Sequence, residues 1–157
     1  MTARRMLLGL AALGLLSCGG ITSPTGTLTD LYLPAEVSVS RASIAVEFVP
    51  APIILRLRNS SATAASVRYG VCAFAVQGFT SQTRSGTPEW VHLLPQLGGC
   101  GPDILYSSNA LPNADTSVEI GTIPTVLLNR APYLKLVYRV AGQSSLNGIA
   151  IEPVAID

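Results

Sequence analysis

Short runs of this chain alternate between apolar and polar residues with a period of two, and this pattern constrains the fold most. In residues 53–58, Ile53, Leu55 and Leu57 oppose Arg56 and Arg58. Successive side chains of a strand point to opposite faces, so the pattern predicts half-buried antiparallel strands. The other runs are EVSVS, SIAVEFV, SVRYGVCAFAV, WVHLL, DILYS, SVEIGTI, YLKLVYRV and GIAIEPVAI.

Two of these runs predict specific faces. In SIAVEFV, we expect Ile44, Val46 and Phe48 to share one face of a strand, with Glu47 on the other. In SVRYGVCAFAV, the apolar residues change phase after Gly70, which predicts a bulge or bend there. Turn-forming residues separate the runs, and no long helix is expected: the alanine-rich residues 62–66 span only about one turn, and residues 125–129 are expected to form a short helical turn. We therefore expect an all-β chain, with a single antiparallel β-sandwich over residues 31–157.

The N-terminus has the pattern of an export signal. Arg4 and Arg5 precede eleven apolar residues, Met6 to Leu16. A membrane-spanning helix needs about 20, so residues 1–17 are expected to form a signal peptide rather than an anchor helix. The alternative is a buried N-terminal helix of a cytosolic domain, which we disfavour because the segment has no polar face.

The residues Leu15-Leu16-Ser17-Cys18 resemble the lipobox of bacterial lipoproteins. The resemblance implies cleavage before Cys18 and lipid attachment to its sulfur, so that the membrane becomes a partner through Cys18. Gly19 follows the cysteine, which in that family favours the outer membrane of a Gram-negative cell. The alternative is an ordinary secretory signal with a free Cys18. Residues 18–30, beginning CGGITSPTGTLT, are expected to be a flexible tether between lipid and domain.

The remaining cysteines, Cys72 and Cys100, are 28 positions apart. Two cysteines in an oxidising compartment usually pair, so we expect a disulfide, which stabilises a fold by about 3–4 kcal/mol in the chain-entropy model. A metal site built from Cys72, His92 and Cys100 is the alternative. The spacings typical of zinc ligands are absent, and His92 is the only histidine, so no metal is expected.

Charge and motifs exclude several classes of function. The chain without residues 1–17 has 8 basic and 9 acidic side chains, which gives no electrostatic reason to bind nucleic acid. No phosphate-binding loop or EF-hand motif is present, so no cofactor is expected. His92 is expected to be an exposed or edge histidine rather than a catalytic base, and no catalytic residue is predicted.

The segment from Gln77 to Pro88, followed by Trp90, is the main candidate for a binding loop. It is polar, contains Arg84, and lies within the span between the two cysteines that are expected to pair. Loops carried by a rigid sandwich often bind partners, with an aromatic residue such as Trp90 as anchor. The alternative for Trp90, which we favour, is packing against the disulfide in the core.

The run ILRLRNSSATAASVRYG resembles the strand–turn–strand opening of bacterial immunoglobulin-like domains, and LPNADTSVEI resembles a later turn of the same family. The resemblance implies an immunoglobulin-like sandwich, and fold resemblance does not carry function. We expect a non-enzymatic binding or assembly module, anchored in the cell envelope, with a protein or surface ligand as partner. The alternatives are a protease-inhibitor-like domain acting through an exposed loop, and a hydrolase with a dispersed acidic pair.

Overall fold

The structure is a computed structural model, and it describes residues 28–70, 72–93 and 105–154. The expected signal peptide, Cys18, most of the tether and Cys100 lie outside the described residues. The side chain of His92 is likewise not described.

The described chain is all-β, as the alternation predicts, with one short helix. The helix α1 spans Thr125–Arg130 and includes the helical turn expected at residues 125–129. The strands are β1 Asp30–Tyr32, β2 Val37–Ala45, β3 Ala51–Asn59, β4 Ala65–Gly70, β5 Phe74–Phe79, β6 Glu89–His92, β7 Leu105–Ala110, β8 Asp115–Ile123, β9 Tyr133–Val140 and β10 Asn147–Val154.

The sheet is mixed. Strands β1 and β9 pair in parallel, as do β10 and β2, whereas the other pairs are antiparallel. The expectation of antiparallel pairing throughout is therefore wrong for these two pairs. Parallel pairing brings together segments that are distant in sequence, such as Ile151 beside Ala42, and local periodicity contains no information about such a pair.

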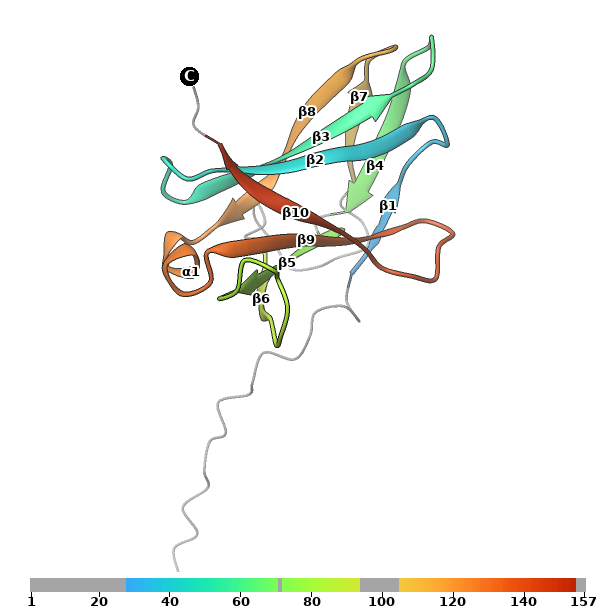
Figure 1. The fold of residues 1–157 in the computed structure, drawn as a ribbon. Coiled ribbons are helices and arrows are strands. Elements are labelled where there is room, and N and C mark those ends of the chain that lie inside the picture. The colour runs from blue at the N-terminus through green and yellow to red at the C-terminus, as the bar shows by residue number, and fades with distance from the viewer. Residues whose placement is uncertain (1–27, 71, 94–104, 155–157) are drawn as a thin grey trace, which may run out of the picture.

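The strands follow the order β7-β4-β1-β9-β10-β2-β3-β8, and β5 pairs with β9 and with β6. Strands β7 and β8 stand at the two ends of this order but are consecutive in the sequence and in contact. The sheet is therefore curled and nearly barrel-like. Figure 1 shows β2, β3 and β10 facing β9 and β5 across the interior, with β1, β4 and β7 at one end.

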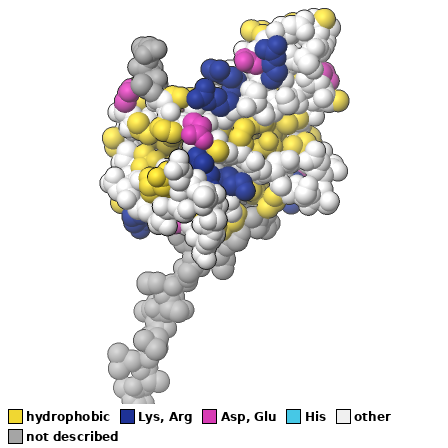
Figure 2. All heavy atoms as spheres, viewed as in Figure 1, with side chains coloured by type: hydrophobic (Ala, Val, Ile, Leu, Met, Phe, Trp, Pro, Cys, Tyr) yellow, Lys and Arg dark blue, Asp and Glu magenta, His cyan; other side chains and the backbone are white. Residues whose placement is uncertain are grey.

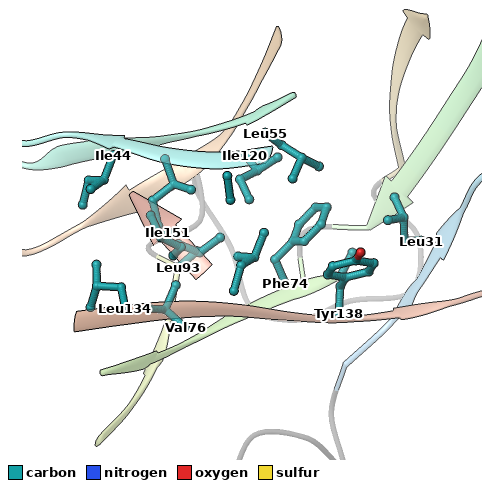
Figure 3. Close-up of a cluster of buried hydrophobic side chains, with 14 of the residues drawn as sticks. Leu31, Ile44, Leu55, Phe74, Val76, Leu93, Ile120, Leu134, Tyr138 and Ile151 are labelled. Carbon is teal, nitrogen blue, oxygen red and sulfur yellow. The ribbon is translucent and has the colours of Figure 1, made fainter. Parts of the chain in front are cut away.

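Apolar side chains from both layers fill the interior. Figure 3 shows Ile44, Leu55 and Ile151 on one side, facing Val76 and Leu134 on the other. All five are at most 2% exposed, and burial of one such side chain stabilises the fold by about 1.5–3 kcal/mol. Near β1, an aromatic group made of Tyr69, Phe74, Tyr106 and Tyr138 has ring centroids 5.6 to 6.2 Å apart.

One buried polar side chain connects two turns. Asn59, at the end of β3, is fully buried. Its amide nitrogen donates to the carbonyls of Thr63 and Ala110 at 2.8 and 3.1 Å, and its amide oxygen accepts from the Ser61 N–H at 2.9 Å. Because each amide atom has a partner, burial of this polar group is compensated.

The alternation predicts the faces of β3 but not the end of β2. Ile53, Leu55 and Leu57 are buried and Arg56 and Arg58 are exposed, as expected. Strand β2 ends at Ala45, where the Phe48 N–H donates to the Ala45 carbonyl at 3.3 Å and closes a turn.

The expectation that Val46 and Phe48 continue the strand face of Ile44 is therefore wrong, since both follow the end of β2 and are 42% and 50% exposed, whereas Ile44 is buried. The phase change near Gly70 is a break between β4 and β5, with the Ala73 N–H bonded to the Gly70 carbonyl at 3.1 Å.

The folded part begins earlier than the tether boundary at residue 30 implies. Leu28 is buried, and Asp30 opens β1. The Arg139 guanidinium on β9 donates to the Asp30 carboxylate at 2.7 Å and to the Leu28 carbonyl. These contacts attach the last residues of the expected tether to the sheet.

Candidate functional site

Most of the described carboxylates are engaged with arginines, each in a different part of the fold. Four of the seven form ion pairs with lengths from 2.5 to 3.4 Å: Asp30 with Arg139, Glu89 with Arg130, Asp115 with Arg58, and Glu152 with Arg84. Three surface hollows are lined by a carboxylate, and each contains only one: Asp30, Glu119 or Glu152. The described residues therefore show no converging acidic pair of the kind that the hydrolase alternative predicts.

The expected binding loop lies against the sheet. Residues 77–79 belong to β5, so the loop proper runs over residues 80–88. Arg84 donates from Nε to the Leu134 carbonyl of β9 at 2.8 Å and from a terminal nitrogen to the Glu152 carboxylate of β10 at 3.0 Å. The Arg84 side chain is only 21% exposed. The loop is thus fixed at its centre and does not project freely.

Trp90, the expected anchor, lies on β6 and packs against a small cluster made of Leu28, Ala75 and Val137. This cluster is separate from the main core. Trp90 therefore covers the segment that leads into β1. The packing against a disulfide that we favoured stays a prediction, because Cys100 lies outside the described residues. Trp90 and Arg84 are not brought into one site by any described contact.

Cys72 is buried and disulfide-bonded. Its expected partner, Cys100, lies outside the described residues, so the Cys72–Cys100 pairing stays a prediction. In the ranges that the structure describes, no group of three or more His, Cys, Asp or Glu residues could hold a metal ion.

Burial changes the titration of two tyrosines in the aromatic group. Burial raises the pKa of Tyr69 above its ordinary value of 10.0, and the neighbouring Tyr106 raises it further. Burial likewise raises the pKa of Tyr138. Both groups stay protonated at neutral pH, so they act here as packing residues.

Basic side chains gather on the outer face of the sheet, which sequence reasoning did not single out. Arg41 on β2 is directly opposite Arg56 on β3, and both side chains are exposed. Figure 2 shows several groups of Lys and Arg side chains across this view of the surface, with Asp and Glu side chains between them. We call Arg41, Arg56 and Lys135 the basic row.

An irregularity in the pairing of β2 with β3 places Arg41 in this row. The register shifts between Val39 and Arg41, and the Ser40 hydroxyl donates to the Arg56 carbonyl at 3.1 Å. A β-bulge re-aims the side chains beside it. The alternation in VSVSRAS breaks at Ser40-Arg41, where two polar residues are adjacent, and this break is the only sign of the bulge in the sequence of the strand.

Lys135 extends the row to β9. It pairs with Ala150 of β10, and Ala150 precedes Ile151, which pairs with Ala42 of β2. Its ammonium group lies over β10, because a β-carbon placed on Gly148 would come within 3.1 Å of the Lys135 nitrogen. Gly148 therefore leaves room for the lysine side chain to cross the outer face toward β2.

The same face becomes apolar toward the turn between β2 and β3. An open hollow of about 420 Å³ is lined by Phe48, Pro50, Pro52, Ile54, Glu119 and Thr122. Val49, at the tip of the turn, is 79% exposed. A second hollow, of about 300 Å³, lies beside the Arg84–Glu152 pair and is lined also by Tyr133 and Pro153. Each hollow contains one carboxylate, Glu119 in the first and Glu152 in the second, and the latter is paired with Arg84.

Comparisons with protein-family models, curated proteins and solved structures found no match for this chain. No described helix is long and apolar enough to span a membrane.

Proposed function

We propose that this chain is an envelope-anchored lipoprotein whose folded part is a non-enzymatic binding or assembly module. The binding role is proposed from the outer face of β2 and β3. This face combines exposed apolar residues at the turn, such as Phe48 and Val49, with Arg41 and Arg56, which have no ion-pair partner among the described residues. Exposed apolar groups rimmed by polar residues are typical of interaction surfaces. The anchor is proposed from the leader and from the lipobox-like residues ending at Cys18.

The finer description of the fold is also a proposal. Two layers of strands facing one another across one apolar interior are compatible with an immunoglobulin-like sandwich. The turn after Asn59, in the run that resembles those domains, supports this relationship because its buried amide organises the crossing between strands.

No described contact supports the protease-inhibitor alternative or the hydrolase alternative. An inhibitor loop has to present its residues to a protease, whereas Arg84 ties the loop of residues 80–88 to β9 and β10. A glycosidase-type hydrolase needs two carboxyl groups about 5–10 Å apart that flank the scissile bond, and four of the described carboxylates are separately engaged with arginines.

The test of the anchor is mass spectrometry of the protein isolated from membrane fractions. We expect the N-terminal residue to be Cys18 with a diacylglycerol on its sulfur and an acylated amino group. The Cys18→Ser variant should lose the lipid and keep its leader. An unmodified Cys18 in the native protein contradicts the anchor. Peptide mapping without reductant tests the disulfide in the same sample, since the Cys72 peptide should be joined to the Cys100 peptide.

The binding role is tested by placing a photo-crosslinking residue at Ile54, in the hollow, in intact cells. We expect crosslinks from this position and none from Ser145, which is exposed in the turn between β9 and β10. Equal crosslinking from both positions argues against a binding surface on this face.

A further inference from the structure

We propose that Arg41 and Arg56 form a binding site for a phosphate group, with Lys135 as a third cation. Residues directly opposite on neighbouring strands have β-carbons about 4.5–5.5 Å apart. Arg41 and Arg56 have this relationship on an exposed face. Their guanidinium groups can therefore reach one small anion together.

The arrangement costs stability unless an anion is bound. Like charges directly opposite on a sheet destabilise it, and a bulge leaves part of the ladder unpaired. Neither Arg41 nor Arg56 has an ion-pair partner in the described parts of the chain. The bulge at Ser40 nevertheless keeps the two arginines opposite each other. A bound anion that neutralises both charges explains why the sheet keeps this unfavourable arrangement.

The nearest acidic side chains on this face do not form ion pairs with Arg41 or Arg56. Asp115 pairs with Arg58, and Glu152 pairs with Arg84. Glu119 is opposite Ile54, two positions along β3 from Arg56, and lines the apolar hollow. The residue opposite Arg56 on β8 is Ser117, a hydroxyl donor that is compatible with an anion beside it.

A phosphate group suits these residues better than a carboxylate does. A carboxylate has two acceptor oxygens and one negative charge, and one guanidinium fork satisfies it. A phosphate group offers more acceptor oxygens, and its monoester has a charge of about −1.5 to −2 at neutral pH. Two arginine forks and the Lys135 ammonium therefore match a phosphate in both charge and donors.

Two sources of phosphate are available at an envelope surface: a lipid headgroup and a free phosphate ion. The lipid source rests on the proposed anchor at Cys18, which keeps the domain within a tether's length of the bilayer, whereas the phosphate chemistry rests on the basic row alone. Mass spectrometry of Cys18 tests the anchor independently, so the two proposals can fail separately.

The experiment measures thermal unfolding of the full chain in a non-ionic detergent at fixed ionic strength. The probes are inorganic phosphate, a diacylglycerol phosphate added to the micelles, and a fatty acid as the carboxylate control. A ligand that binds only the native state raises the midpoint with its concentration. We expect both phosphate probes to raise the midpoint and the fatty acid to have no such effect.

The Arg41→Gln/Arg56→Gln double variant should bind phosphate at least about tenfold more weakly, the loss expected when charge-assisted hydrogen bonds are removed. Without phosphate its midpoint should equal or exceed that of the parent, because the repulsion is gone. The matched control is Arg68→Gln/Arg130→Gln, which removes two arginines that already have partners, the Tyr32 ring and Glu89. Its phosphate affinity should not change.

Several results overturn the proposal: no midpoint shift with either phosphate probe, an equal shift with the fatty acid, or equal weakening in both double variants. A lower midpoint of the Arg41→Gln/Arg56→Gln variant without phosphate also overturns it, since the arginines would then stabilise the sheet by themselves. A shift with inorganic phosphate alone assigns the site to the free ion, and a stronger shift with the lipid assigns it to the headgroup.

Discussion

Arg84 and Glu152, which are 68 positions apart in the sequence, form a 3.0 Å ion pair that holds the β5–β6 loop against β10. The same guanidinium also donates to the Leu134 carbonyl. The backbone of Arg84 has a φ of 52°, in the left-handed region, which costs a non-glycine residue about 1–2 kcal/mol. The side-chain contacts offset this cost and fix the loop conformation.

Replacement of Arg84 should therefore release the loop without unfolding the protein. In Arg84→Gln we expect faster amide hydrogen exchange across residues 80–88, and a fall of no more than about 1–2 kcal/mol in the free energy of unfolding. Arg58→Gln is the control, because it removes an exposed ion pair with Asp115 that joins β3 to β8 and involves no residue of the loop or its flanking strands. Unchanged exchange in the loop of Arg84→Gln means that other contacts hold it.

The sequence predicted the burial of a side chain best where that burial depends only on the residue's position within its own strand. The alternation in β3 predicted its buried and exposed faces, and the short helical turn was found within α1. It failed at Val46 and Phe48, because an apolar run continues through the turn that ends β2, and periodicity alone does not show where a strand stops.

The local alternation of apolar and polar residues did not predict contacts between segments that are distant in the sequence. The position of Trp90 depends on Leu28 and Val137, and the parallel pairing of β10 depends on β2. The basic row depends on a bulge at Ser40 and on the order of β3, β2, β10 and β9. Of the expected site residues, Arg84 and Trp90 are described and share no described contact, whereas Cys18 and Cys100 lie outside the described residues.

The adjacent residues Ile53 and Ile54 offer a direct test of the faces of β3. Ile53 is fully buried, whereas Ile54 lines the outer hollow. We expect Ile53→Ala to lower the free energy of unfolding by about 2–5 kcal/mol, as is usual for a buried isoleucine. Ile54→Ala should cost clearly less. The measurement is urea denaturation of both variants, and equal losses would contradict the assignment of the two faces.

Asn59 provides a second test, because its amide cannot be replaced by a carboxylate. Asn59→Asp removes the two N–H donors to the Thr63 and Ala110 carbonyls and places an acceptor against both. We expect a loss of about 2 kcal/mol or more at neutral pH, measured by urea denaturation. Asn109→Asp, an exposed change on β7, should have little effect. Similar small losses in both variants contradict the role given to Asn59.

The raised pKa values of Tyr69 and Tyr138 predict a loss of stability at alkaline pH. The unfolded chain releases these protons near the ordinary pKa of 10.0, whereas the folded chain keeps them to higher pH. Above pH 10 the unfolded state therefore binds fewer protons than the native state, and the free energy of unfolding falls as pH rises. Each tyrosine contributes at most about 1.4 kcal/mol per pH unit, and only between its two pKa values.

Urea denaturation between pH 9 and pH 11.5 should show this fall in the free energy of unfolding. The Tyr69→Phe/Tyr138→Phe variant should make the fall shallower, since phenylalanine keeps the ring and has no proton to lose. Other groups that titrate in this range affect parent and variant alike, so the difference between their slopes is the quantity to compare, and identical slopes contradict the prediction.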